Sequence, residues 1–326
     1  MSLIERAIGK LHAHQPTPPV SPLARDVSDS APASGPARPP AAEDPAGVGE
    51  AAARSASSPI PSEEKRREAG ADAPAAPLLE IPSHRLARQG FIVPGAEPVR
   101  ALNEFRIIKR PLIYNVSERK KPPLTNARRI MVTSALPGEG KTFCALNLAL
   151  SIADERDHAV LLVDADVARP SLPRILGVEP RAGLMDALQD PNLDVGALVS
   201  PTSVEKLSIL MAGRPHGRAT EMLASAAMSA LLQQISARFP DRIVVFDSPP
   251  LLVTTEASAL AVHMGQIVLV VESGRTDRNT VAAALATLEA APGEISTLMN
   301  KASKRASGEF RPYGGYGYGY GYGAQA

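Results

Sequence analysis

The chain has 326 residues, enough for about two average domains, but 16 of its 31 prolines fall within residues 1–98. Lys and Arg number 35 and Asp and Glu 34, a formal net charge of +1, which argues against a protein-wide phosphate-binding surface and against nucleic acid as a partner. The single cysteine, Cys144, excludes an internal disulfide framework and a zinc site with several thiolates, as is typical of a reducing compartment. We expect a cytoplasmic protein.

The first 98 residues are expected to form a tether. Residues 1–14 place apolar side chains on one side of a helix, which predicts a short amphipathic helix that docks on a partner or a membrane surface; the alternative is an accidental pattern at a fraying terminus. Residues 15–98 are rich in Pro and Ala and nearly lack aromatics, so we expect a disordered linker. No apolar segment reaches the roughly 20 residues of a membrane span, and no signal peptide is expected.

Residues 99–305 are expected to form one α/β domain. Apolar residues recur at helical spacing from Leu102 until Pro111 disturbs the period, which predicts an initial helix. Short continuous apolar runs then predict strands buried on both faces. These runs are RIMVTS, AVLLVDAD, LSIL, RIVVFDS, QIVLVVES and STLMN. Because helical stretches separate them, we expect a mostly parallel sheet with helices on both faces and ligands at the carboxyl ends of the strands.

The segment SALPGEGKT, Ser134 to Thr142, stands between a predicted strand and an apolar helix. This is the layout of a phosphate-binding loop, in which backbone N–H groups and a helix N-terminus face the anion, Lys141 reaches the outer phosphates and the Thr142 hydroxyl binds Mg²⁺. Ala135 stands where the usual pattern has its first glycine. The alternative is a chance GKT at a helix start.

Three carboxylates follow apolar runs at the same expected sheet edge. Asp164 and Asp166 end the second predicted strand and project to one side of an extended chain, and Asp247 ends RIVVFD. Acidic groups beside a triphosphate are unfavourable unless a cation lies between them, so we expect Mg²⁺ bound by Thr142, Asp164, Asp166 and Asp247. One carboxylate would accept a proton from an attacking hydroxyl. The alternative for Asp166 is that it only caps the next turn.

SALPGEGKT, LLVDADVARP and VVFDSPP, in this order, resemble the Walker A, A′ and B motifs of bacterial tyrosine autokinases, the BY-kinase family, over about residues 84 to 326. Within the family the chain most resembles the exosortase-associated, exopolysaccharide-type autokinases. The resemblance implies a P-loop NTPase fold, ATP and Mg²⁺ as cofactors, and Lys141, Asp164 and Asp166 as catalytic residues, with Asp164 as the base. It implies nucleotide contacts from Pro137, Gly138, Glu139, Gly140, Lys141, Thr142, Phe143, Arg169 and Asn300.

The chain departs from the family pattern at two places. The family's DxDxR motif has its arginine where this chain has Ala168, and Arg169 follows one residue later. The oligomerisation helix ExxRxxR of the family aligns with Asn103, Arg106 and Lys109, so only the central arginine is retained; an ordinary solvated helix face is the alternative. Asn300 matches the segment where adenine packs in the family, or is a turn residue at a strand end.

Residues 306–326 form a Gly/Tyr-rich tail that holds five of the six tyrosines. Glycine at nearly every second position makes packed structure entropically costly, so we expect a flexible segment. In a tyrosine autokinase this tail is the phosphoacceptor; the alternative is a low-complexity segment that only self-associates. The expected acceptors are Tyr313, Tyr316, Tyr318, Tyr320 and Tyr322.

The resemblance also implies a biological setting. It points to regulation of exopolysaccharide synthesis and export together with an inner-membrane chain-length or co-polymerase activator, to a peripheral position at the inner membrane, and to a homo-oligomer. A positioning ATPase of the partition or cell-division type shares this fold, but its signature lysine position is Leu136 here. A non-catalytic interaction module is disfavoured by the intact Lys141, Thr142, Asp164 and Asp247.

Overall fold

The computed structural model describes residues 76–93, 100–117 and 119–302, all within Pro61–Ala326, the second of the two units into which the chain divides. The expected N-terminal helix, residues 1–14, and the tyrosine-rich tail, residues 306–326, lie outside the described residues. Among the helices described, none combines the length and the apolar character needed to cross a membrane.

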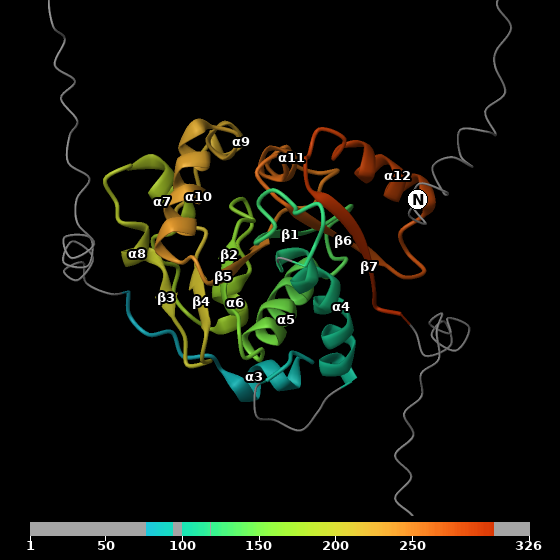
Figure 1. Cartoon of the computed structure of the whole chain (residues 1–326), viewed down its shortest axis with the longest axis horizontal. Helices are drawn as coiled ribbons and strands as arrows, with labels where there is room; N and C mark the ends of the chain where they lie inside the picture. The colour runs from blue at the N-terminus through green and yellow to red at the C-terminus, as the bar shows by residue number, and fades with distance from the viewer. Residues whose placement is uncertain (1–75, 94–99, 118, 303–326) are drawn as a thin grey trace, which may run out of the picture. The chain divides into compact units, whose positions relative to one another are not determined.

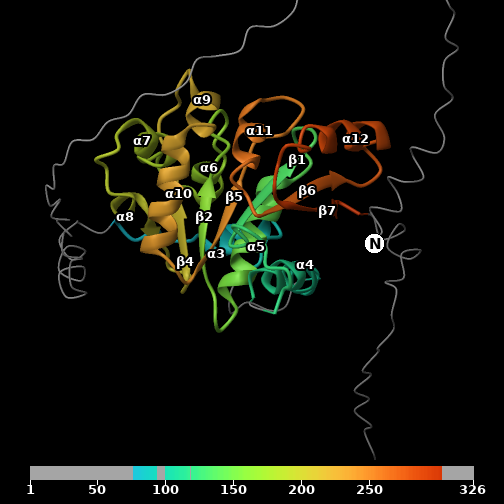
Figure 2. The same cartoon turned by 45° about the horizontal axis from the view of Figure 1, so that its top comes forward.

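A seven-stranded sheet with the order β3-β4-β2-β5-β1-β6-β7 forms the centre of the described domain (Figures 1 and 2). All neighbouring strands are parallel except β3, which pairs antiparallel with β4 at one edge. The six expected strands are confirmed, and the two-residue β3 is an addition. The strands are β1 Arg129–Ser134, β2 Ala159–Asp164, β3 Ser200–Pro201, β4 Leu207–Leu210, β5 Arg242–Asp247, β6 Gln266–Glu272 and β7 Glu294–Asn300.

Helices cover both faces of this sheet, as expected. Successive strand residues point to opposite faces, so Ile130 and Met131 belong to two different hydrophobic cores. One core includes α3 Ser83–Arg88, α4 Arg100–Val116, α5 Lys141–Ala153 and α6 Leu172–Leu176. The other includes α7 Leu184–Gln189, α8 Val195–Leu198, α9 Ala219–Leu223, α10 Ala226–Arg238, α11 Glu256–Ala261 and α12 Arg278–Ala286.

The expected linker, residues 15–98, is too long at its C-terminal end. Residues 76–93 pack on the domain: Leu79 bridges to Thr202 beside β3, and Leu79, Leu86 and Phe91 are buried in the core of α4 and α5. These few apolar side chains hardly change the average composition of residues 15–98, which is why composition alone predicts a linker. The packed domain therefore begins before residue 99.

The initial helix α4 continues through Pro111 to Val116, beyond the proline that was expected to disturb it. Its residue Lys109 is only 3 % exposed, and its Nζ lies 2.7 Å from Glu155 Oε1 and donates a hydrogen bond to the Ser151 carbonyl. Lys109 thus binds α5 within the same chain, whereas Arg106, one turn away, is exposed.

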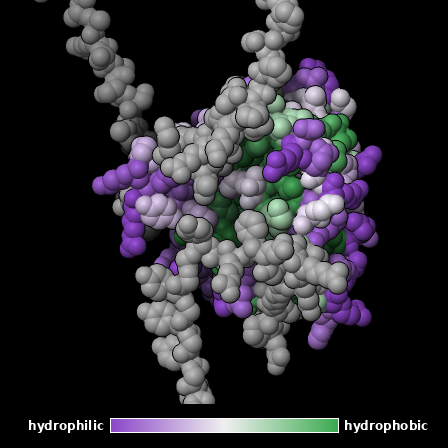
Figure 3. All heavy atoms as spheres, turned by 90° about the vertical axis from the view of Figure 1, so that its right-hand side faces the viewer, coloured by the Kyte–Doolittle hydropathy of each residue, from purple (hydrophilic) through white to green (hydrophobic). Residues whose placement is uncertain are grey.

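The edge strand β7 and the neighbouring helix α4 expose apolar side chains to solvent. Met299 on β7 is 63 % exposed and Ile107 on α4 is 74 % exposed. On the side where β7 and α12 lie, apolar residues appear among hydrophilic ones (Figure 3). At the other edge of the described sheet, the backbone of Leu79 bonds to Pro201 of β3 and to Ser203 after it, so this edge is partly covered.

Candidate nucleotide-binding and catalytic site

The phosphate-binding loop joins β1 to α5 and depends on two glycines with left-handed backbone. Gly138 has φ 86° and Gly140, which caps α5, has φ 97°. A Cβ atom on Gly140 would also lie only 2.2 Å from Nδ2 of Asn300. These positions need glycine, and the resulting turn directs the start of α5, with its free N–H groups, toward the carboxyl edge of the sheet.

Glu139 holds this loop in shape. Its carboxylate is buried, with Oε2 accepting from the Leu136 N–H at 2.6 Å and Oε1 accepting from the Thr276 hydroxyl. The Glu139 carbonyl accepts from Asn300 Nδ2 at 2.8 Å. Glu139 and Asn300, both expected at the nucleotide, thus contact the loop itself, and neither lines the cavity described next.

A cavity of about 500 Å³ opens beside the loop at the carboxyl ends of the strands. Six of the expected residues line it: Pro137, Gly138, Lys141, Thr142, Asp166 and Arg169. Seven further residues line it that the sequence does not predict, namely Ala168, Ser171, Arg174, Ile175, Pro250, Val253 and Thr254. Most come from the five-residue α6 and the segment after β5, which are too short or too irregular to show a hydrophobic periodicity in the sequence.

Lys141 is held by a carboxylate at this cavity. Its Nζ lies 2.7 Å from Asp166 Oδ2, and both side chains are largely buried. Burial lowers the pKa of Lys141, but the charges of Asp247 and Asp166 outweigh it, so the pKa is raised and the lysine stays charged. Asp166 Oδ1 also accepts from the Arg169 N–H at 3.2 Å, so this carboxylate caps the turn as well.

Asp164 and Asp247 lie behind Lys141 as direct neighbours on β2 and β5 and are fully buried. Asp164 Oδ2 accepts from the Leu172 N–H at 3.3 Å. Burial and the charge of Asp247 raise the pKa of Asp164 to about 8. Burial likewise raises the pKa of Asp247 to about 6, against the opposing effects of Lys141 and the nearby Thr142 hydroxyl.

The unpartnered oxygens of these two carboxylates fit a bound Mg²⁺. Asp164 Oδ1 and both side-chain oxygens of Asp247 have no hydrogen-bond partner of good geometry. Carboxylate and hydroxyl oxygens are ligands that Mg²⁺ prefers, and it usually completes its shell with water and phosphate oxygens. Among the described residues, no three His, Cys, Asp or Glu side chains are grouped so that they could hold a metal ion, so Asp164, Asp166 and Asp247 do not form the expected three-carboxylate cluster.

The side chain of Phe143 does not face the nucleotide cavity, contrary to expectation. Its ring packs against Phe91, with centroids 5.0 Å apart, and against Phe105 at 6.5 Å. The ring therefore belongs to the core between α3, α4 and α5. Only the backbone of Phe143 remains available to an anion at the start of α5.

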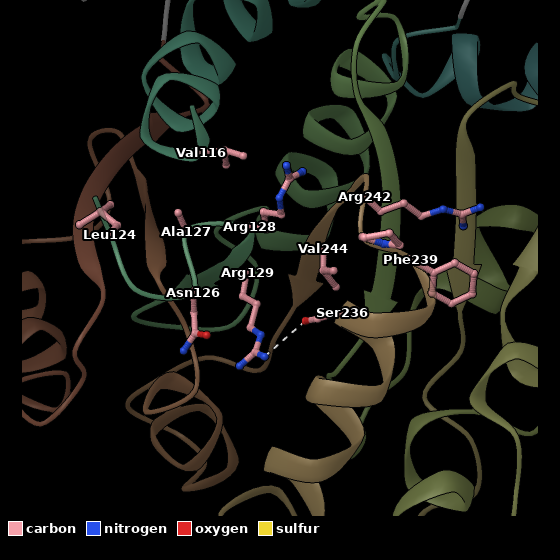
Figure 4. Close-up of a pocket in the computed structure, with 11 residues that line it drawn as sticks. Val116, Leu124, Asn126, Ala127, Arg128, Arg129, Ser236, Phe239, Arg242 and Val244 are labelled. Atoms are coloured by element: carbon pink, nitrogen blue, oxygen red, sulfur yellow. Dashed lines mark hydrogen bonds between the residues drawn. The ribbon is translucent and has the colours of Figure 1, made fainter. Parts of the chain in front are cut away.

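A second cavity, of about 290 Å³, lies near the amino ends of β1 and β5 and is lined by Arg128, Arg129 and Arg242 among others. Its guanidinium groups point in different directions (Figure 4). Arg129 donates to the Ser236 hydroxyl at 3.4 Å, and Arg242 lies over the Phe239 ring, 4.5 Å from its centroid. These cations do not converge on one anion, so the cavity beside the phosphate-binding loop is the candidate site.

Comparison with known proteins agrees with this geometry. Residues 126–270 match the family model "ParA: NUBPL iron-transfer P-loop NTPase". Over 188 residues the chain is 32 % identical to the tyrosine-protein kinase YwqD of Bacillus subtilis, covering 57 % of this chain and 78 % of YwqD. Over 165 residues it is 36 % identical to the succinoglycan biosynthesis transport protein ExoP of Rhizobium meliloti, covering 48 % of this chain but only 20 % of ExoP.

Solved kinase domains share the fold. The kinase domain of the Escherichia coli tyrosine kinase ETK is 24 % identical, with a TM-score of 0.55, over 80 % of this chain and 99 % of that domain. The BceF tyrosine kinase domain is 25 % identical, with a TM-score of 0.51, over 72 % of this chain and 96 % of that domain. The extent of the match to YwqD, together with the loop and its carboxylates, shows that the chain belongs to the family of bacterial tyrosine-protein kinases.

Proposed function

We propose that this chain transfers the γ-phosphoryl group of ATP to the tyrosines of its own C-terminal tail. The observation that carries the proposal is the placement of Lys141 at the loop cavity, paired with Asp166 and backed by the buried Asp164 and Asp247. Such an arrangement suits phosphoryl transfer, in which positioning and charge neutralisation supply most of the catalysis.

Each group of the site has a task in this reaction. The N–H groups at the start of α5 would bind the phosphates, and Lys141 would exchange Asp166 for a phosphate oxygen. Thr142, Asp247 and their neighbours would hold Mg²⁺, which would supply neutralising charge at the phosphates. The phenolic oxygen forms the new bond to phosphorus, the bond from the γ-phosphorus to the bridging oxygen breaks, and ADP leaves with that electron pair.

The phenol proton passes to a carboxylate. A free tyrosine has a pKa near 10 and is barely ionised at neutral pH, so a base close to it is useful. Asp164 is the proposed acceptor: burial and the charge of Asp247 raise its pKa, and the charge of Lys141 opposes this and favours the ionised form that can take a proton. Asp166, in contrast, lines the cavity directly, so substituting each carboxylate in turn distinguishes the two acceptors.

The tail begins close to the site. The last described residue is Ala302, and the preceding Lys301 donates from Nζ to the Gly138 carbonyl of the loop at 2.7 Å. Tyr313 follows Asn300 by 13 residues. A flexible segment of that length would span roughly 20 Å and at most about 45 Å, enough for the cavity of the same chain or of a neighbouring copy.

We further propose that the kinase works at the inner membrane with a polysaccharide co-polymerase activator and as a homo-oligomer in exopolysaccharide synthesis and export. The name of ExoP, a succinoglycan biosynthesis transport protein, supports this setting. Residues 1–14 are the proposed docking element. Deleting them is expected to release the protein from membrane fractions while kinase activity with added activator persists; unchanged fractionation would argue against this role.

Incubation of the full chain with Mg-ATP and detection of phosphotyrosine tests the proposal. Wild type should become phosphorylated, whereas Lys141→Met and a truncation after Arg311 should not. The truncated chain should still bind ATP, which separates loss of acceptors from loss of the fold. Hydrolysis without phosphotyrosine in wild type would instead indicate a positioning ATPase, and absence of both reactions with activator present would indicate an interaction module.

A further inference from the structure

A second pocket lies beside the nucleotide cavity on the far side of α6. It has a volume of about 440 Å³ and is lined by residues around α6 and by the segment after β4. Arg174 of α6 lines both this pocket and the nucleotide cavity, so the two hollows adjoin at this residue. We call it the flanking pocket.

The lining of the flanking pocket suits an aromatic ring. Pro170, Pro173, Pro180 and Pro215 contribute flat apolar surfaces, and the floor includes the buried Met211. Methionine sulfur and arginine both interact favourably with aromatic rings.

The charges at the flanking pocket favour a ring that carries a hydroxyl or a phosphate. Arg174 and Arg181 are the charged side chains of its lining, which among the described residues includes no carboxylate. Guanidinium groups stack on rings and form paired hydrogen bonds with phosphate. A tyrosine and its phosphorylated product would both be accommodated.

The tail supplies several tyrosines at a short and regular spacing. Tyr316, Tyr318, Tyr320 and Tyr322 alternate with single glycines. In an extended strand, residues two apart project to the same side, about 7 Å from each other, and four apart about 14 Å. Glycine has no side chain to hold such a backbone away from the protein surface.

The tail is also long enough. The flanking pocket adjoins the end of β4, whereas the tail leaves from β7, five strand spacings away in the sheet. Five spacings amount to roughly 24 Å. The 16 to 22 residues from Asn300 to the alternating tyrosines would span about 22 to 26 Å as a flexible chain.

We propose that the flanking pocket binds the ring of one tail tyrosine while another tyrosine of the same tail occupies the nucleotide cavity. This inference rests on the proposed autokinase function and adds to it a second subsite for the acceptor. The repeated Tyr-Gly pattern then provides anchoring rings as well as acceptors. The last tyrosine left unmodified still has a neighbour to anchor it.

The first test retains in the full chain only the tail tyrosine that is modified earliest in wild type, as identified by mass spectrometry. The other four are replaced by Phe in one variant and by Ala in a second. Phe keeps the anchoring ring, so this variant should be phosphorylated within about twofold of the wild-type rate at that site. The Ala variant should be slower by roughly three- to tenfold, the range expected for loss of one ring contact. Equal rates would overturn the proposal.

The second test changes the pocket. Pro215→Asp places a charge at the exposed rim, and Pro240→Asp, exposed on the loop between α10 and β5, is its matched control. Pro215→Asp should slow tail phosphorylation by roughly three- to tenfold with ATP binding unchanged, and the control should not. In the variant whose other four tail tyrosines are replaced by Ala, Pro215→Asp should have no further effect, because the ring that the pocket binds is already missing. Equal slowing with and without these Ala substitutions would contradict the binding of a tail ring in this pocket. Absence of phosphotyrosine in wild type would refute the proposed function instead.

Discussion

Asp164 and Asp247 occupy directly opposed positions on the parallel strands β2 and β5, and both carboxylates are completely buried. Two acidic groups so close in a low-dielectric site cannot both ionise without cost, and both pKa values are raised above 3.8. The two ionised carboxylates would therefore repel each other, and a bound cation would reduce this repulsion. This arrangement favours a metal-nucleotide complex over an empty cavity.

This pair makes stability depend on pH when nucleotide and Mg²⁺ are absent. Because folding raises both pKa values, the stabilising contribution is complete below about pH 4 and is lost as the pH rises through about 6 for Asp247 and about 8 for Asp164. We expect the free energy of unfolding, measured with urea in EDTA, to fall more steeply from pH 5 to pH 8.5 in wild type than in Asp247→Asn, by on the order of 1–3 kcal/mol. Parallel pH profiles would contradict the coupling.

The proton acceptor can be identified by comparing two isosteric substitutions. Asp164→Asn should lower kcat by roughly 100-fold or more, because the general base is lost, while the affinity for ATP measured without Mg²⁺ changes by less than about threefold. Asp166→Asn removes the ion-pair partner of Lys141, so we expect it to change the affinity for ATP as well as kcat. Single-turnover phosphorylation and ATP titration check this. A larger loss of kcat in Asp166→Asn, with normal kcat in Asp164→Asn, would reassign the base to Asp166.

The phosphate-binding loop should reject a side chain at Gly140 for two reasons. Gly140→Ala faces both a left-handed φ and a contact of 2.2 Å with Asn300 Nδ2, whereas Gly274→Ala has φ 75° and no atom within 4 Å. The control should lose about 1 kcal/mol of stability from backbone strain alone. Gly140→Ala should lose more and bind ATP at least tenfold more weakly. Equal thermal stability and equal ATP affinity in both variants would show that the Asn300 contact is unimportant.

Lys109 and Arg106 should have different effects although they lie one turn apart on α4. Lys109→Met leaves Glu155 without its partner and should lower the free energy of unfolding by roughly 1–3 kcal/mol. Arg106→Met, at an exposed position, should leave stability within about 0.5 kcal/mol but reduce oligomer size in light scattering if the proposed assembly uses this helix. The reverse pattern would contradict the internal role of Lys109.

Sequence patterns predicted the parts of this protein in which local chemistry determines structure. Continuous apolar runs such as RIVVFD indicated the strands, and the glycines around Lys141 indicated the loop, because only glycine suits its left-handed backbone. Long-range packing was not visible in the sequence. The side chains of Leu79, Leu86 and Phe91 pack only when strands distant in sequence supply a surface, so the local composition predicts a linker there.

Within the site, sequence order predicted which residues gather but not which way each side chain turns. Glu139 turns inward to the loop, and the Phe143 ring packs with Phe91 and Phe105. Ser171 and Arg174 line the cavity, which the sequence does not predict, because α6 is too short to show a hydrophobic periodicity. Their positions follow from the tertiary arrangement of α6 beside α5.

The central claim is that the carboxyl-edge cavity phosphorylates the tail. Mass spectrometry of the full chain after incubation with Mg-ATP tests it most directly, with Lys141→Met as the inactive control. Phosphate on one or more residues between Tyr313 and Tyr322 in wild type, and none in Lys141→Met, is the predicted result. An unmodified tail in a wild-type sample that consumes ATP would contradict the account.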